Sequence, residues 1–308
     1  MLKNPKVSIV IPSFNEEKNI LRTAKVIRQV MKKVYCELEI IFVDDGSKDA
    51  SWEKICEASK KYPEVRGVLF SRNFGKEAAI YAGLSECRGD CAVVIDCDLQ
   101  HPPEKIIEMF EMWRQGYEIV EGVKSDRGDE SHIHRFCARS FYKVISRAAN
   151  IDMSRSSDFK LLDRKAILAI LNIREQGAFF RALTSWVGFK TAEVEYDVAE
   201  RFAGESKWST KKLIRYAISN IASFTTIPMQ LVSILGLVIF VATSVLSIVS
   251  IIQKINGTAL GGFTTLIIMN GFTSSIIMLS LGVIGYYLSR IYDEVKARPR
   301  YVISEKTK

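Results

Sequence analysis

The sequence has few histidines and no paired cysteines, which limits the metal and redox chemistry open to it. None of its six cysteines forms a CxxC pair, and none of its three histidines has zinc-ligand spacing with a cysteine. We therefore expect no structural zinc and no disulfide, in keeping with a domain in the reducing cytoplasm. The residues are Cys36, Cys56, Cys87, Cys91, Cys97 and Cys137, with His101, His132 and His134.

Glycine is missing from the loop after the first predicted strand, which reads Pro12-Ser13-Phe14-Asn15-Glu16-Glu17. Nicotinamide and flavin enzymes place a GxGxxG motif in that loop, because glycine lets the backbone approach a pyrophosphate closely. Its absence argues against a dinucleotide-dependent oxidoreductase.

Charge is missing from two long apolar stretches, Leu231–Ile252 and Thr264–Ser289. Each is long enough to cross a hydrocarbon core of about 30 Å as a helix. Two core helices of a soluble domain are the alternative, and the position of the stretches excludes a signal peptide. Neither stretch holds an ionisable residue that would mark a polar pathway, which argues against a transporter or flippase. We predict a two-helix transmembrane hairpin.

Basic residues flank this predicted hairpin on its two outer sides, whereas the connecting segment 253–263 holds only Lys254. By the positive-inside rule, both termini and the large N-terminal domain face the cytoplasm. We therefore expect a multi-pass protein of the cell inner membrane. The flanking residues are Arg201, Lys207, Lys211, Lys212 and Arg215 before the hairpin, and Arg290, Lys296, Arg298 and Arg300 after it.

The rest of the 308-residue chain, which carries a net charge of +8, is long enough for one large α/β domain. Apolar strand-like runs alternate with segments of helical periodicity, which predicts βαβ units and a mostly parallel, Rossmann-like sheet. The predicted strands are residues 7–12, 38–43, 65–70, 91–95 and 118–123, and the predicted helices are 16–33, 51–61, 76–87, 103–115 and 135–150.

We divide the chain into an α/β domain (1–205), an amphipathic juxtamembrane segment (206–228), the hairpin (229–290) and a cytoplasmic basic tail (291–308). Between Ser209 and Phe224, apolar residues recur at helical spacing with basic residues between them. That pattern is typical of a helix in the membrane interface, with a core helix of the soluble domain as the alternative.

Two carboxylates, Asp96 and Asp98, directly follow the short apolar run Ala92–Ile95, and Pro102-Pro103 then prevents the strand from continuing. Such a run predicts a buried parallel strand, and ligands of open α/β sheets bind at the carboxyl ends of such strands. Mg²⁺ is usually held by one or two carboxylates plus substrate phosphates, so this pair is a candidate metal site. A solvated acidic turn is the alternative interpretation of the motif alone.

Five motifs, taken together, identify a family. They are PSFNEE and VDDGS after the first two strands, SRNFGK at 71–76, DCDLQHPPE at 96–104 and SDFKLL at 157–162. In this order they resemble glycosyltransferase family 2 over about residues 6–210. The subgroup most similar is the polyprenyl-phosphate glycosyltransferases, such as dolichyl-phosphate mannose synthase and the hairpin-anchored bactoprenol glucosyltransferases. The resemblance implies a GT-A fold and a glycosyltransferase that depends on Mg²⁺ or Mn²⁺.

The resemblance also implies roles for individual residues. Asp96, Asp98 and Asp158 are the expected catalytic residues, with Asp96 and Asp98 holding the metal and Asp158 as the base candidate. A turn aspartate is the alternative for Asp158, and solvated juxtamembrane charge is the alternative for Arg201 and Lys207. The expected acceptor-phosphate residues are Arg201, Ser206 and Lys207. The expected nucleotide-sugar residues are Pro12, Phe14, Asn15, Glu16, Asp44, Lys76, Asp96 and Gln100.

The expected reaction is an inverting transfer of a hexose to undecaprenyl or another polyprenyl phosphate, with glucose from UDP-glucose as the expected donor. GDP-mannose, UDP-N-acetylhexosamine and UDP-aminoarabinose remain open. The acceptor phosphate has a second pKa of about 6 and arrives largely ionised, so we expect Asp158 to orient a substrate as much as to remove a proton. The expected partners are the nucleotide sugar, the lipid, the membrane and further copies of this chain, and not nucleic acid.

Two other functions compete with this one. A processive polysaccharide synthase would carry a QxxRW motif, which the residues around Trp186 and Trp208 do not reproduce, and two helices do not enclose a polymer channel. A non-catalytic membrane scaffold is the second, since a fold does not imply a function. Against it, the acidic site residues and the basic residues that the resemblance implies are all present: Asp44, Asp96, Asp98 and Asp158, with Arg201 and Lys207.

Overall fold

The computed structural model describes residues 4–125, 157–173, 179–197, 227–257 and 261–307. The chain divides into two compact units, one of Met1–Leu213 with Pro299–Lys308 and one of Ile214–Arg298. The predicted helices at 135–150 and within 209–224 lie outside the described residues.

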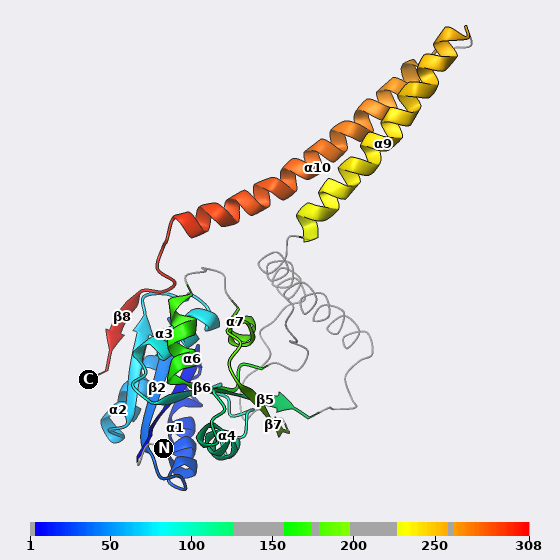
Figure 1. Ribbon diagram of the computed structural model, residues 1–308. Helices are drawn as coiled ribbons and strands as arrows, with labels where there is room; N and C mark the ends of the chain where they lie inside the picture. Colours follow the sequence, from blue (N-terminus) through cyan, green and yellow to red (C-terminus); the bar gives the residue numbers. More distant parts are fainter. Residues whose placement is uncertain (1–3, 126–156, 174–178, 198–226, 258–260, 308) are drawn as a thin grey trace. The chain divides into compact units, whose positions relative to one another are not determined.

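The first unit is built on an eight-stranded mixed sheet with the strand order β7-β5-β6-β4-β1-β2-β3-β8 (Figure 1). Parallel pairs join β1 to β2 and β4, β2 to β3, and β5 to β7, whereas β6 runs antiparallel to β4 and β5, and β8 antiparallel to β3. The strands are β1 (Lys6–Ser13), β2 (Glu37–Asp44), β3 (Val65–Phe70), β4 (Cys91–Val94), β5 (Ile119–Lys124), β6 (Lys160–Asp163), β7 (Thr191–Tyr196) and β8 (Ile303–Lys306).

Helices cover both faces of this sheet, which explains why its central strands are continuous apolar runs. On one face, apolar side chains of α1, α2 and α4 belong to one buried cluster with Val7, Ile9 and Ile11 of β1, and on the other, those of α3, α6 and α7 belong to a second cluster with Val10. The helices are α1 (Ile20–Met31), α2 (Ser51–Lys61), α3 (Lys76–Glu86), α4 (Lys105–Arg114), α6 (Arg164–Asn172) and α7 (Phe180–Trp186).

These elements confirm the predicted α/β fold class. The five predicted strands correspond to β1 to β5, and four of the predicted helices correspond to α1 to α4, with shifts of a few residues at their ends. The sequence analysis did not anticipate β6, β7 and β8. Two of these, β6 and β8, have only four residues each and pair with strands distant in sequence, so they carry little periodic signal of their own.

The second unit contains two long helices, α9 (Ile227–Ile255) and α10 (Phe263–Val295), which lie side by side (Figure 1). Their segments Ile234–Ile255 and Met269–Val295 are long and apolar enough to cross a membrane, judged by length and composition. Neither segment is buried by other described residues.

The chain after α10 returns to the first unit and adds β8 to the edge of the sheet beside β3. The ring of Tyr301 stacks on Phe70 at a centroid distance of 5.0 Å, and its hydroxyl lies 2.9 Å from Ser85 Oγ. Farther along, Gly67 N–H donates to Thr307 Oγ1 and Trp52 Nε1–H to Glu305. Because β8 pairs with the exposed hydrogen-bonding groups of β3, it protects an edge that could otherwise pair with another chain.

Replacing Tyr301 with alanine should therefore lower the free energy of unfolding of the first unit by roughly 1–3 kcal/mol, through lost ring stacking and burial. Val302→Ala, which shortens an exposed side chain of the same segment, is the control and should change stability by less than about 0.5 kcal/mol. Thermal unfolding of both full-length variants in detergent is the measurement. Equal stability of the two would show that the Tyr301 ring contributes nothing to the unit.

Candidate active site

The site forms where β1, β2 and β4 end. These three strands are parallel neighbours, so their carboxyl ends meet at one edge of the sheet. Asn15 N–H donates to Ser47 Oγ at 2.8 Å, and Lys48 N–H donates to Asn15 Oδ1 at 2.9 Å, which ties the loops after β1 and β2 together. Asn15 and Leu99 both have positive φ, of 55° and 56°. Non-glycine residues rarely adopt this conformation, and such strain concentrates at functional sites.

Asp44, at the end of β2, is fully buried, and only one of its two carboxylate oxygens has a hydrogen-bond partner among the described residues. Its Oδ1 accepts a hydrogen bond from Ser47 N–H at 2.9 Å, whereas its Oδ2 has no partner among the described residues. Burial raises the pKa of this carboxyl above its ordinary value. A buried oxygen without a donor is costly, so this one is suited to accept a hydrogen bond from a ligand.

Of the other residues predicted to bind the nucleotide sugar, Pro12 lies at the end of β1 and Phe14 just beyond it. Glu16 N–H donates to Ser51 Oγ at 2.8 Å, and the Glu16 carboxylate accepts from Asn19 Nδ2 at 2.6 Å. Gln100 N–H donates to Asp98 Oδ1 at 3.1 Å. Thus the predicted nucleotide-sugar residues from the loops after β1, β2 and β4 lie at the same edge of the sheet.

Asp45, which the sequence analysis did not select, holds the loop that leads to Lys76. Its carboxylate accepts hydrogen bonds from Asn73 Nδ2 at 2.9 Å, from Phe74 N–H at 2.6 Å and from Gly75 N–H at 2.9 Å. Gly46, beside it, has φ of 67°, and a Cβ there would lie 2.5 Å from the backbone of Arg72. The loop after β2 therefore fixes the start of α3, where Lys76 stands.

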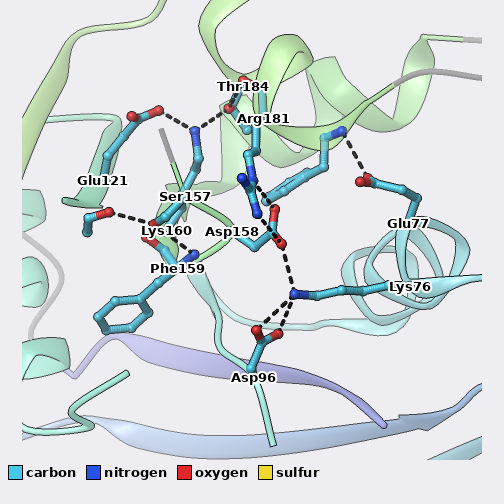
Figure 2. A network of polar contacts seen from close by, with 12 residues as sticks. Lys76, Glu77, Asp96, Glu121, Ser157, Asp158, Phe159, Lys160, Arg181 and Thr184 are labelled. Carbon is cyan, nitrogen blue, oxygen red and sulfur yellow. Dashed lines mark hydrogen bonds and ion pairs between the residues drawn. The ribbon is translucent and has the colours of Figure 1, made fainter. Parts of the chain in front are cut away.

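Lys76 joins two of the predicted catalytic carboxylates (Figure 2). Its Nζ lies 2.6 Å from Asp96 Oδ1 and 2.8 Å from Asp158 Oδ2. Burial would lower the pKa of Lys76, but the two carboxylates raise it well above its usual range. Burial likewise acts to raise the pKa of Asp96, and the Lys76 ammonium instead lowers it. Lys76 therefore lies between two carboxylates that favour its charged form.

Asp158 has a second cationic partner, Arg181 of α7, which the sequence analysis did not select. Arg181 Nε–H donates to Asp158 Oδ1 at 2.7 Å, and an Nη2–H donates to Asp158 Oδ2 at 3.0 Å (Figure 2). Burial alone would raise the pKa of Asp158, but Lys76 and Arg181 hold it well below its usual range. A carboxylate so strongly ionised is a poor proton acceptor.

A second charged pair lies beside this group. Lys160 is fully buried and forms an ion pair with Glu121, and its Nζ also donates to Thr184 Oγ1 at 2.7 Å. Burial lowers the pKa of Lys160 below its ordinary value, although Glu121 opposes this. The pair connects β5 and β6 to α7, the helix that carries Arg181.

The donor set at Asp96 and Asp98 fits a hard divalent cation in chemical type, since it offers only carboxylate oxygens. No group of three or more His, Cys, Asp or Glu side chains that could hold a metal occurs among the residues the structure describes. Two carboxylates leave several coordination positions to other oxygen ligands, as expected where Mg²⁺ arrives with a diphosphate. The predicted acceptor residues Arg201, Ser206 and Lys207 lie outside the described residues.

A mixed α/β sheet with acidic side chains at the carboxyl ends of its strands has its candidate site where open α/β sheets bind ligands. The chain belongs to glycosyltransferase family 2, whose model, described as "Glycosyl transferase family 2", matches residues 8–171. This match confirms the predicted family and enzyme class: the protein is a glycosyltransferase.

Full-length relatives support the same conclusion. An uncharacterized glycosyltransferase of Bacillus subtilis is 40% identical, with 99% of this chain and 95% of the relative covered. A prophage bactoprenol glucosyl transferase homolog of Escherichia coli is 37% identical, with 97% and 98% covered. The bactoprenol glucosyl transferase of Shigella phage SfV is 36% identical, with 98% and 100% covered.

Removing the Lys160 side-chain charge should destabilise the fold because it leaves the Glu121 carboxylate without its partner. We expect Lys160→Met to cost about 3–5 kcal/mol of unfolding free energy. Lys160→Met combined with Glu121→Gln leaves no unpaired charge and should recover at least half of that loss. Thermal or denaturant unfolding of the two variants in detergent is the measurement. A double variant as unstable as the single one would show that the ion pair is not what Lys160 contributes.

Proposed function

We propose that this protein transfers glucose from UDP-glucose to undecaprenyl or another polyprenyl phosphate, with inversion at the anomeric carbon. The observation that carries the proposal is the similarity to proteins named bactoprenol glucosyl transferases, at 36–37% identity over nearly the whole chain. That similarity extends through the two apolar helices as well as the α/β unit. It therefore favours a membrane-bound acceptor over a soluble one.

The charges at the site support such a reaction. A polyprenyl phosphate is largely ionised at neutral pH and needs little help from a base to attack. The step instead requires alignment of two anions and neutralisation of the charge that develops on the leaving nucleoside diphosphate. Lys76 supplies one fixed cation at this edge, and Asp44 Oδ2 supplies an acceptor for a base N–H or a ribose hydroxyl.

Asp96 and Asp98 would hold Mg²⁺ or Mn²⁺, which when bound supplies Lewis-acid stabilisation of the diphosphate. Arg201 and Lys207 would contact the acceptor phosphate, Arg201 through a bidentate fork and Lys207 as a point charge. The two apolar helices would hold the enzyme at the cytoplasmic face of the inner membrane, where the lipid phosphate is exposed. At Gly236, Gly282 and Gly285 an added Cβ would meet no atom of the described residues within 4 Å, so these positions would allow helices of another copy to approach closely in a homo-oligomer.

A panel of nucleotide sugars tests the donor and the acceptor together. Membranes containing the protein are incubated with undecaprenyl phosphate and labelled UDP-glucose, GDP-mannose, UDP-N-acetylglucosamine or UDP-aminoarabinose. We expect a glucosyl lipid phosphate as the main product by mass spectrometry. Another sugar in that product would replace UDP-glucose as the donor, and no lipid product from any donor would overturn the proposal.

Asp98→Ala should lower kcat at least ~100-fold, a loss of about 2.7 kcal/mol of transition-state stabilisation, while the protein remains folded. Excess chelator should abolish activity in the wild type, and Mg²⁺ or Mn²⁺ should restore it. Glu108→Ala, which removes an exposed carboxylate that pairs with Lys105 on α4, is the control and should leave the rate unchanged. Full activity in chelator would contradict a metal requirement.

Arg201→Lys keeps the positive charge but loses the bidentate fork. We expect it to weaken the use of polyprenyl phosphate by the roughly 1.5–3 kcal/mol of a charged hydrogen bond, with little change in KM for the nucleotide sugar. Steady-state kinetics with each substrate varied in turn is the measurement. A change confined to the nucleotide sugar would place Arg201 at the donor instead of the acceptor.

A further inference from the structure

Arg181 holds Asp158 through a bidentate hydrogen bond, which is more specific than attraction between two opposite charges. Two of its N–H groups donate to the two different oxygens of the same carboxylate, at 2.7 and 3.0 Å. This fork-on-fork geometry fixes the plane of a carboxylate as well as its charge. The Asp158 side chain is 8% exposed and that of Arg181 is 27% exposed, so water competes little for the contact.

The helix that carries Arg181 is itself held by charged side chains from two other elements (Figure 2). At its start, the Phe180 N–H donates to the Glu77 carboxylate of α3 at 2.9 Å. Within it, Thr184 Oγ1 receives a hydrogen bond from Lys160 and donates to the Arg181 carbonyl at 2.9 Å. A helix of seven residues contributes little stability by itself, so these contacts determine where the guanidinium lies.

We propose that Arg181 is a positioning residue of the glycosyl-transfer site, which locks the Asp158 carboxylate in one orientation so that Asp158 aligns a substrate and does not take its proton. The proposal rests on the proposed function, because it assigns the way in which Asp158 serves that reaction. Asp158 hydrogen-bonds to the cations Lys76 and Arg181, and its charge also acts on the surrounding side chains of Glu77, Asp96, His101, Lys160 and Tyr196.

The hydrogen bonds at Asp158 support alignment over proton transfer. Both carboxylate oxygens already accept hydrogen bonds from cations, Oδ1 from Arg181 and Oδ2 from Arg181 and Lys76. Protonating such a carboxylate would cost it these charge-assisted bonds. One lone pair, on Oδ1, would still accept a hydrogen bond from a sugar hydroxyl, and that contact needs the carboxylate plane to be fixed.

A double-variant cycle with full-length protein in detergent tests this assignment. The variants are Arg181→Gln, Arg181→Lys, Asp158→Asn and the combination Arg181→Gln with Asp158→Asn, assayed with UDP-glucose and undecaprenyl phosphate. We expect Arg181→Gln to lower kcat by about 10- to 100-fold with the KM for UDP-glucose within about threefold, and Arg181→Lys to recover part of the rate. If Arg181 acts through Asp158, the combined variant should be no slower than Asp158→Asn alone.

The chain offers a matched control in Arg66, which pairs with Glu39 at 2.8 Å at similar exposures of 21% and 6%, between β2 and β3. Arg66→Gln should lower the melting temperature much as Arg181→Gln does, without lowering kcat per folded molecule. The combined variant at Arg181 and Asp158 leaves no unpaired charge between them, so it remains measurable even if Arg181→Gln folds poorly.

The outcomes separate this assignment from the proposed function. If the wild-type protein transfers sugar to the lipid and Arg181→Gln does so at the same rate, the role of Arg181 is overturned and the proposed function stands. Additive effects would overturn that role too: in that case Arg181→Gln slows the Asp158→Asn variant by the same factor as it slows the wild type. Wild-type protein that makes no lipid product from any donor overturns the proposed function and this assignment with it.

Discussion

The Lys76 ammonium, placed between the carboxylates of Asp96 and Asp158, is the contact on which the site depends. It joins the start of α3, the loop after β4 and the segment before β6, three regions far apart in sequence. A charge removed from water is stable only when it is paired, and Asp158, whose side chain is 8% exposed, pairs with Lys76 as well as with Arg181. The three segments are therefore held together by the same charges that substrates would encounter.

The scaffold around this contact limits how far Lys76 can move. Asp45 accepts hydrogen bonds from the loop just before Lys76, and Gly46 permits the close approach of that loop to the end of β2. On the opposite side, Arg181 and the Glu121–Lys160 pair fix Asp158 and α7. Fixed dipoles and charges stabilise developing charge without the reorganisation that water would need. The ionic network thus supplies fixed charge at the site, which offsets its cost in stability.

The sequence was sufficient for the sheet core and for the acidic edge, because both depend on local patterns. Continuous apolar runs identify β1 to β4, and the carboxylates that follow β2 and β4 mark the edge where ligands bind. Arg181 and Asp45 were missed for the opposite reason: each acts through contacts with residues distant in sequence, and nothing local distinguishes it. The tail strand β8 was missed because its pairing with β3 spans more than two hundred residues.

The charges of the free site also bear on how it would receive substrates. Lys76 uses hydrogen bonds to Asp96 and to Asp158, and an ammonium has three donors. With a divalent cation and a diphosphate at Asp96, that carboxylate would no longer need Lys76 as its counter-charge. Lys76 would still be held by Asp158, and a donor released from Asp96 would be available to a phosphate oxygen. Asp158, kept in place by Arg181, would then fix the position of the Lys76 ammonium. On this argument Asp158, besides aligning a substrate, anchors a positive charge for the diphosphate that would leave the anomeric carbon in the proposed reaction.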